Sequence, residues 1–176
     1  MWKLQCQREV NKQINLEFWA SYQYHFIWSH FNRNSVGLEN VANYFKKASD
    51  EEREHAHKLM EYQNMRGGSV ELVDITNVDL RYLNQKAREG LPNENDVLAS
   101  FRKALEMEII VYDSLLELHK VADDNNDPQF ADFIEGEYLE EQVKAISEIE
   151  KYISQLERIG DNGHGVWDFD RNLGSD

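Results

Sequence analysis

Residues that cross-link or turn a chain are scarce in this sequence of 176 residues. It has one cysteine, two prolines and nine glycines. A single cysteine excludes an intramolecular disulfide framework and a metal site built on several thiolates. An all-β sandwich or barrel needs a turn about every ten residues, whereas long stretches here contain neither glycine nor proline. The composition therefore predicts a helical protein.

Basic residues and long apolar runs are also scarce. The chain has 19 lysine and arginine residues against 33 aspartate and glutamate residues, a formal net charge of −14. A phosphate backbone must be met by a basic face, so we expect no nucleic acid as partner and a surface that attracts cations. No stretch approaches the about 20 apolar residues of a membrane span, and the first residues lack the apolar core of a signal peptide. We therefore expect no membrane partner and, by default, a cytoplasmic location.

Four long stretches carry apolar stripes whose members are four or three residues apart, the spacing of one face of a helix. Each stretch spans about 25 to 30 residues, or about 40 Å of helix. Their matched lengths predict an all-α protein, a four-helix bundle in a single domain over residues 1–176. The stretches run from about Gln5 to Phe31, between Gly37 and Gly67, from Val97 to the polar cluster at Asp123, and from Pro128 to Gly160, and a short amphipathic fifth helix runs from Gly163 to Asn172.

The connection between the second and third stretches is long. Residues 67 to about 93 are too many for a tight turn between antiparallel neighbours, and they include an alternating apolar piece at residues 70–75. We expect this connection to cross the domain, so that the second and third helices run parallel. The fourth helix has a clear start, because Asp127 before Pro128 is an N-cap followed by proline at the first helical position.

Each apolar stripe is interrupted by polar residues near the middle of its helix. A single buried glutamate is more often a paired structural residue than a ligand, but interruptions at one level in four helices indicate a shared site. No lysine or arginine occupies a stripe position to neutralise the carboxylates. Because desolvating one unpaired carboxylate already costs several kcal/mol, the missing positive charge is most simply a bound cation. The interrupting residues are Glu17, Glu52, His55, Glu108 and Gln142.

The types of ligand narrow the choice of metal. Glu52 and His55 are three residues apart on one helical face and can reach one ion, and Glu52 with Glu108 can bridge two ions. Oxygen ligands with one imidazole and no sulfur suit iron or manganese and leave zinc open. Di-iron bundles carry Glu-x-x-His on two helices, but the fourth stretch has Gln142-x-x-Ala145 in the second place. We therefore expect one well-built site and one weak site, which suits passage of metal better than permanent retention.

Several segments, taken together at their spacing, resemble ferritin. The resemblance covers nearly the whole chain, from about Cys6 to Leu173. It implies a ferritin-like four-helix bundle with a long crossover between the second and third helices and a short fifth helix at the C-terminus. The segments that carry it are Ile14-Asn15-Leu16-Glu17, Ala20-Ser21-Tyr22-Gln23-Tyr24, Glu51-Glu52-Arg53-Glu54-His55-Ala56, Tyr62-Gln63-Asn64-x-Arg66-Gly67-Gly68, Ser114-Leu115-Leu116-Glu117-Leu118-His119-Lys120, Asp132-Phe133-Ile134-Glu135 and Glu141-Gln142-Val143-Lys144-Ala145.

The resemblance also implies a function. Ferritins of the heavy-chain type are ferroxidases, which oxidise Fe(II) with dioxygen at a di-iron centre inside the bundle and store Fe(III) as a mineral. Their hollow shell has 24 subunits, so the implied partners are copies of this chain or other ferritin subunits. All the family's catalytic positions are filled here, unlike those of the light type. By motif position, Glu17, Glu52 and His55 hold the first iron and Glu52 and Glu108 the second, with Gln142 beside it and Tyr24 next to the centre.

Two further metal-binding regions are implied in the same way. Asp132 and Glu135 match the acidic pair that lines the three-fold entry channels, with His119 near the outer end. A ring of carboxylates there attracts Fe(II), as in other cation pores. The residues that match positions facing the storage cavity, where the mineral nucleates, are Glu51 and Glu54, together with His57 in place of the family's usual glutamate.

The C-terminal segment points to a subgroup of the family. Residues 163–170 are similar to plant and algal ferritins more than to vertebrate ones. A plant-type ferritin is normally found in the plastid stroma, which is therefore the alternative to the cytoplasm. Neither a transit peptide nor the plant-type extension peptide is recognised at the start of the sequence.

Two other readings of the polar interruptions remain open. The first is a di-iron carboxylate oxidase or peroxidase that keeps its metals and stores nothing. The absence of a second Glu-x-x-His and the channel-like pair Asp132 and Glu135 count against it. The second is a structural bundle or shell subunit whose buried polar residues only fix the register of the helices.

Overall fold

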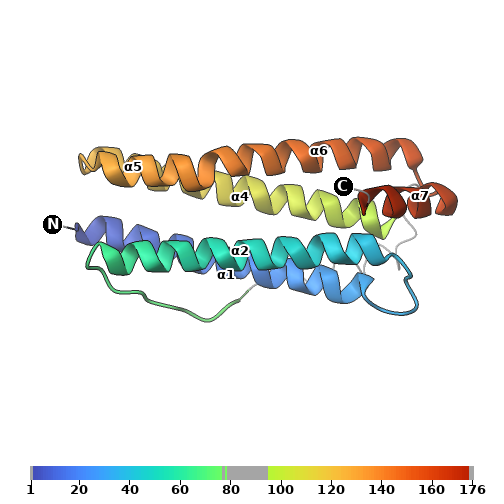
Figure 1. Ribbon diagram of the computed structural model, residues 1–176, viewed down its shortest axis with the longest axis horizontal. Coiled ribbons are helices and arrows are strands. Elements are labelled where there is room, and N and C mark those ends of the chain that lie inside the picture. Colours follow the sequence, from blue (N-terminus) through green and yellow to red (C-terminus); the bar gives the residue numbers. More distant parts are fainter. Residues whose placement is uncertain (1, 77, 79–94, 175–176) are drawn as a thin grey trace.

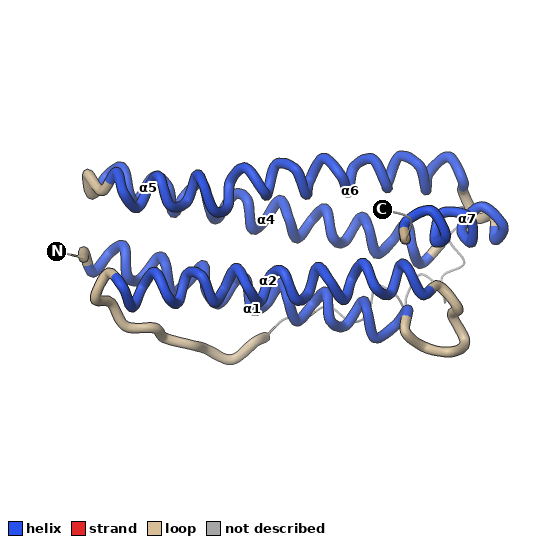
Figure 2. Tube along the Cα trace, in the orientation of Figure 1, coloured by secondary structure: helices blue, strands red, loops and turns tan. Residues whose placement is uncertain are grey.

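The computed structural model describes residues 2–76, 78 and 95–174. These ranges contain helices and connecting segments but no strand (Figure 2). Within them, four helical bodies form a bundle, and the fourth is a single rod made of the segments α5, η1 and α6 (Figure 1). A short helix, α7, lies at one end. The bounds are α1 Leu4–Phe31, α2 Glu39–Met65, α4 Asp96–Asp124, α5 Pro128–Ile134, the π-helical η1 Glu135–Leu139, α6 Glu140–Ile159 and α7 Gly163–Leu173.

The bundle consists of two antiparallel helix pairs. One pair is α1 with α2, and the other is α4 with the rod of α5 and α6 (Figure 1). α2 and α4 run in the same direction, as the long connection between them predicts. The four-helix bundle with a short C-terminal helix is therefore confirmed.

The first part of the connection after α2 runs back along the outside of the bundle (Figure 2). Two asparagine side chains of α1 hold its backbone. Asn11 Nδ2 donates to the carbonyl oxygen of Ser69 at 3.0 Å, and Asn15 Oδ1 accepts from the backbone N–H of Val73 at 2.9 Å. The alternating apolar piece at residues 70–75 is thus an irregular segment tied to α1. The remainder of the predicted crossover, residues 77 and 79–94, lies outside the described residues.

The apolar stripes face the core, as their spacing predicts. Val10 and Ile14 of α1, Leu59 of α2 and Leu115 of α4 are all completely buried. Burying such side chains is the main driving force for packing amphipathic helices together. None of the helices in the described part of the chain is long and apolar enough to cross a membrane.

The fourth helical body departs from a regular α-helix at Glu135–Leu139, which forms a π-helical turn. A π turn accommodates one extra residue without breaking the helix. Tyr138 lies within this turn and is buried, and its hydroxyl donates to the carbonyl oxygen of His55 at 2.9 Å. The turn therefore links the fourth body to the middle of α2.

The C-terminal helix caps the start of α2. The residue before α2, Leu38, makes no side-chain cap, but the carboxylate of Asp170 on α7 accepts from the backbone N–H of Val41 at 2.8 Å. Asp170 is only 6% exposed. It thus satisfies one of the unpaired N–H groups in the first turn of α2 and places a negative charge at the positive end of that helix.

We expect Asp170→Ala to lower the free energy of unfolding by about 1–2 kcal/mol, the usual cost of losing an N-cap. Urea denaturation followed by circular dichroism measures this change. Asp168→Ala is the matched control, because Asp168 is an exposed aspartate of the same helix whose carboxylate accepts from the neighbouring Asn172 side chain at 3.3 Å rather than from the start of α2. Equal destabilisation by the two substitutions would contradict the capping role.

Candidate metal centre

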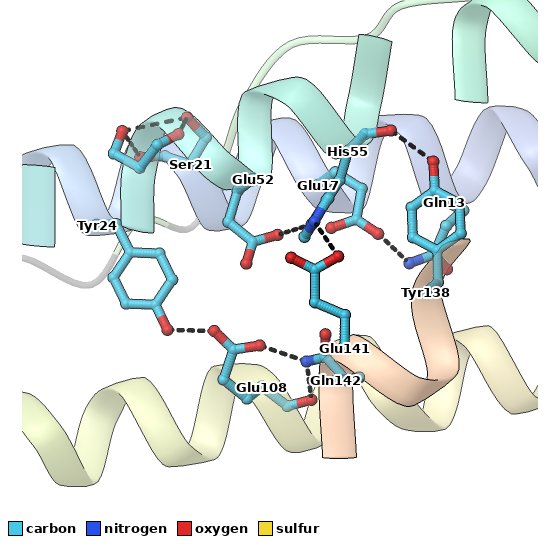
Figure 3. A network of polar contacts seen from close by, with 11 residues as sticks. Gln13, Glu17, Ser21, Tyr24, Glu52, His55, Glu108, Tyr138, Glu141 and Gln142 are labelled. Atoms are coloured by element: carbon cyan, nitrogen blue, oxygen red, sulfur yellow. Dashed lines mark hydrogen bonds and ion pairs between the residues drawn. The ribbon is translucent and has the colours of Figure 1, made fainter. Parts of the chain in front are cut away.

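The polar residues that interrupt the four stripes meet inside the bundle (Figure 3), and the helix bounds place them about midway along the helices. All of them are buried, and so is Tyr24. Glu17, Glu52 and His55 each offer one ligand atom, and these three atoms lie within 4.8 Å of one another. His55 Nδ1 is 3.3 Å from Glu52 Oε2. The structure thus brings two carboxylates and an imidazole close enough to share one metal ion.

Glu108 of α4 lies on the opposite side of this group, and both of its carboxylate oxygens accept hydrogen bonds (Figure 3). The Tyr24 hydroxyl donates to Oε1, and the Gln142 amide donates to Oε2. The same amide nitrogen also donates to the backbone carbonyl of Glu108 at 3.0 Å. Tyr24 and Gln142 therefore fix the orientation of the Glu108 carboxylate.

Glu17 of α1 is held differently. Its Oε1 accepts from Nε2 of Gln13 at 2.7 Å. Its Oε2 is buried and has no hydrogen-bond partner among the described residues. A buried carboxylate oxygen without a partner is costly in a folded protein, and a cation at this position would remove the cost.

Burial raises the pKa of all three carboxyl groups in the centre. The pKa of Glu52 rises from 4.5 to about 8, first because the group is buried and next because Glu108 carries a like charge nearby. Burial and the charge of Glu52 raise the pKa of Glu17 well above its ordinary value. Burial also raises the pKa of Glu108, although the hydrogen bonds from Tyr24 and Gln142 oppose this. Without a metal the centre therefore holds protons near neutral pH, and divalent cations would displace them.

The centre opens into a cavity of about 360 Å³ that extends between α2 and α6. Glu52, His55 and Glu108 line its inner part. The exposed side chains Lys47 and Glu148 also line it, so the cavity connects the centre to the surface. An ion or a small molecule such as dioxygen has a path to the buried carboxylates.

Three groups next to the predicted ligands were not anticipated from the sequence. Gln13 holds Glu17, and its only signal is that it lies four residues before Glu17, one turn along the helix. Glu141 is half exposed, and its Oε2 lies 3.5 Å from Nε2 of His55. Tyr138, within the π-helical turn, contacts the ring of His55 edge-on. Tyr138 has the signal of a stripe position four residues before Gln142, and the only signal for Glu141 is its place next to Gln142 in the sequence.

The residues that match cavity-facing positions lie on the exposed side of α2, and of these Glu51 also lines the cavity that leads to the centre. Glu51 forms an ion pair with Lys47 at 3.5 Å. His57 Nδ1 lies 3.9 Å from Glu54, and the histidine ring packs edge-on against Phe18. The role of these residues in nucleation stays a prediction.

The residues that match the entry channel lie near one end of the bundle. His119 Nε2 is 2.6 Å from Glu135, and its Nδ1 is 3.4 Å from Asp123. Asp132 is exposed and lies three residues before Glu135 on the same helical body. The structure thus pairs His119 with Glu135 directly and adds Asp123 to the acidic surroundings. Their role in a channel stays a prediction as well.

Comparisons with known proteins agree with the resemblance. The ferritin-like domain family matches residues 7–159. "Ferritin, chloroplastic" of Malus baccata var. xiaojinensis is 48% identical over 169 residues, which are 96% of this chain and 64% of that protein. "Ferritin-2, chloroplastic" of Zea mays is 47% identical over 168 residues, again 96% of this chain and 64% of that protein. The chain therefore spans somewhat less than two thirds of the length of these relatives.

Proposed function

Because the family match covers most of its length, this chain belongs to the ferritin family, and on that premise we propose that it stores iron and is a ferroxidase. Its substrates are Fe(II) and dioxygen, and its product is a mineral of Fe(III). It acts as one ferritin-like domain over residues 1–176. The observation that carries the proposal is the buried group of Glu17, Glu52 and His55, in which one carboxylate oxygen of Glu17 has no partner in the described part of the chain.

The residues of the centre fit two iron ions that bind transiently. Their donors are carboxylate oxygens and one imidazole nitrogen, a set that suits iron. Glu17, Glu52 and His55 bind the first Fe(II). Glu52 is shared with the second Fe(II), which Glu108 also binds. Each ion has two carboxylate ligands, but the first also has the imidazole of His55, whereas only the neutral amide of Gln142 lies beside the second, and this weaker site favours release.

The protein contributes charge, orientation and access to the reaction. Two Fe(II) ions would supply one electron each to one dioxygen molecule, which takes up two protons from water and leaves as hydrogen peroxide, and the carboxylates would hold both ions next to each other for this transfer. Tyr24 and Gln142 keep Glu108 facing the centre. Burial and the nearby Glu108 raise the pKa of Tyr24 well above its ordinary value, so its hydroxyl keeps its proton and remains a donor. The cavity between α2 and α6 provides the way in and out.

We propose that the chain assembles into a shell of 24 subunits, made of this chain alone or mixed with other ferritin subunits. Asp132, Glu135 and His119 draw Fe(II) into the three-fold channels, and Glu51, Glu54 and His57 receive Fe(III) on the cavity side. Two relatives carry the word chloroplastic in their names, which supports the plastid stroma over the cytoplasm as the location.

The test is to add Fe(II) anaerobically to the purified protein, admit air, and follow Fe(III) absorbance while particle size and iron content are measured. We expect hundreds of iron atoms or more in a particle near about 500 kDa, the mass of 24 chains of 20.7 kDa. About two iron atoms per chain in a small oligomer would contradict storage and indicate a di-iron oxidase or peroxidase.

A further inference from the structure

A chain of two side-chain hydrogen bonds leads from α4 through α1 to the candidate metal centre. Ser114 Oγ donates to Oε1 of Gln13 at 2.5 Å, and Gln13 Nε2 donates to Oε1 of Glu17 at 2.7 Å. Gln13 is 1% exposed, and Glu17 is completely buried. Two neutral side chains therefore connect a half-buried serine to a carboxylate at the heart of the centre.

The first hydrogen bond holds in place the amide that makes the second. A glutamine amide has a donor end and an acceptor end. The Ser114 hydroxyl donates to the acceptor end of Gln13, and the donor end faces Glu17. If the amide turned over, its oxygen would lie against the carboxylate, and two acceptors would meet in a buried place. Because a serine hydroxyl can donate or accept, the ionised Glu17 carboxylate selects this orientation of Gln13, and Ser114 holds the amide in it by pairing the buried amide oxygen.

Because of the second hydrogen bond, the two carboxylate oxygens of Glu17 have different surroundings. Oε1 is occupied by the amide of Gln13, whereas Oε2 has no partner in the described residues. In Glu108 both oxygens accept hydrogen bonds. Gln13 is also neutral, so unlike a lysine it supports the carboxylate without cancelling the negative charge that a metal ion requires.

We propose that Ser114 and Gln13 are positioning residues, which hold Glu17 so that Oε2 alone is presented to the first Fe(II). This rests on the proposed function, because it assumes that Glu17 binds metal. Groups that orient metal ligands through hydrogen bonds typically change metal affinity by about 10- to 100-fold when they are removed. Gln13 and Ser114 touch no metal position themselves and act through Glu17.

The test is Co²⁺ binding to the assembled, metal-free protein, measured by isothermal titration calorimetry and by the visible absorption of the bound ion. The part of the Co²⁺ binding curve that Glu17→Gln removes is assigned to this centre and is called its binding phase. In that phase we expect Gln13→Leu to weaken Co²⁺ binding by about 10- to 100-fold and to alter the absorption spectrum. We expect Ser114→Ala to weaken it less, and Ser114→Thr, which keeps the hydroxyl, to restore it.

A double-mutant cycle separates positioning from simple loss of packing. We expect Ser114→Ala to have no further effect on Co²⁺ affinity once Gln13→Leu is present, because Ser114 acts only through Gln13. Gln63→Leu is the matched control. Gln63 is equally buried, but its amide bonds to Trp2 and to backbone oxygens of Gln7 and Ser69, so this change should lower stability and leave the phase intact.

The outcomes distinguish the inference from the function on which it rests. If Glu17→Gln leaves Co²⁺ binding unchanged, Glu17 is not a ligand and the proposed centre fails. If Glu17→Gln removes the phase but both Gln13→Leu and Ser114→Ala bind Co²⁺ as the parent does, the positioning role is overturned. Should Gln13→Leu not assemble, Ser114→Ala alone decides, because Ser114 is only half buried and its truncation is mild.

Discussion

Replacing Glu52 by glutamine should abolish rapid oxidation of Fe(II) and, at the same time, stabilise the metal-free protein. Glu52 is the one carboxylate that serves both ions in the proposed function, so its loss should slow oxidation by at least about 100-fold, beyond the effect of losing an orienting group. The same carboxylate is 4% exposed and close enough to Glu108 for the like charge to raise its pKa. Neutral glutamine of equal size removes this repulsion and should add about 1–4 kcal/mol to the free energy of unfolding at pH 8.

Two measurements test this pair of effects. Stopped-flow absorbance of Fe(III) after mixing with aerated buffer gives the rate, and urea denaturation in the presence of a chelator gives the stability. Glu61→Gln is the matched control, because Glu61 is an exposed glutamate on the same helix, and we expect it to leave both values unchanged. A slow variant that has also lost stability would instead favour a structural role for Glu52 in fixing the bundle.

Much of the bundle could be predicted because helix periodicity is a local property of the sequence. The stripes of the first three long helices advance in alternating steps of four and three residues, and each of these segments is an uninterrupted α-helix. The fourth stripe contains two successive steps of four, from Ile134 to Tyr138 and from Tyr138 to Gln142. The π-helical turn at Glu135–Leu139 lies at this point. A π turn carries more residues per turn, so the extra residue is absorbed there and Gln142 still faces the core.

The residues of the candidate centre could be selected from the sequence because each interrupts a stripe, and a stripe position faces the core whatever its residue type. Spacing does not determine how side chains pair across helices. The contact of Ser114 with Gln13 joins residues 101 positions apart, and the capping of Val41 by Asp170 joins residues 129 positions apart. Such pairs depend on the rotation of each helix and on side-chain rotamers, which are determined by packing of the whole bundle.

The metal-free protein should lose stability as the pH rises from about 5 to about 8. Glu52 has a pKa of about 8 in the folded chain, against an ordinary value of 4.5, so between these values the folded state binds a proton that the unfolded state releases. In that range stability falls with pH, by as much as about 1.4 kcal/mol per pH unit for one such group. The raised pKa values of Glu17 and Glu108 act in the same direction.

Comparison with Glu52→Gln and with the metal-loaded protein isolates this effect from the general repulsion of a chain with a net charge of −14. Urea denaturation at several pH values should give a less negative slope for Glu52→Gln than for the parent when both are metal-free. Saturating Zn²⁺ should reverse the parent's slope, because the ion binds the deprotonated carboxylates and so favours the folded state more as protons leave.

The same linkage requires that Zn²⁺ binding at pH 7 releases protons, which a pH indicator in weakly buffered solution measures directly. Two results would contradict this: equal slopes of stability against pH for the metal-free parent and Glu52→Gln, or Zn²⁺ binding without proton release. Either would show that the buried carboxyl groups are already ionised. The metal would then neutralise existing charge rather than displace protons.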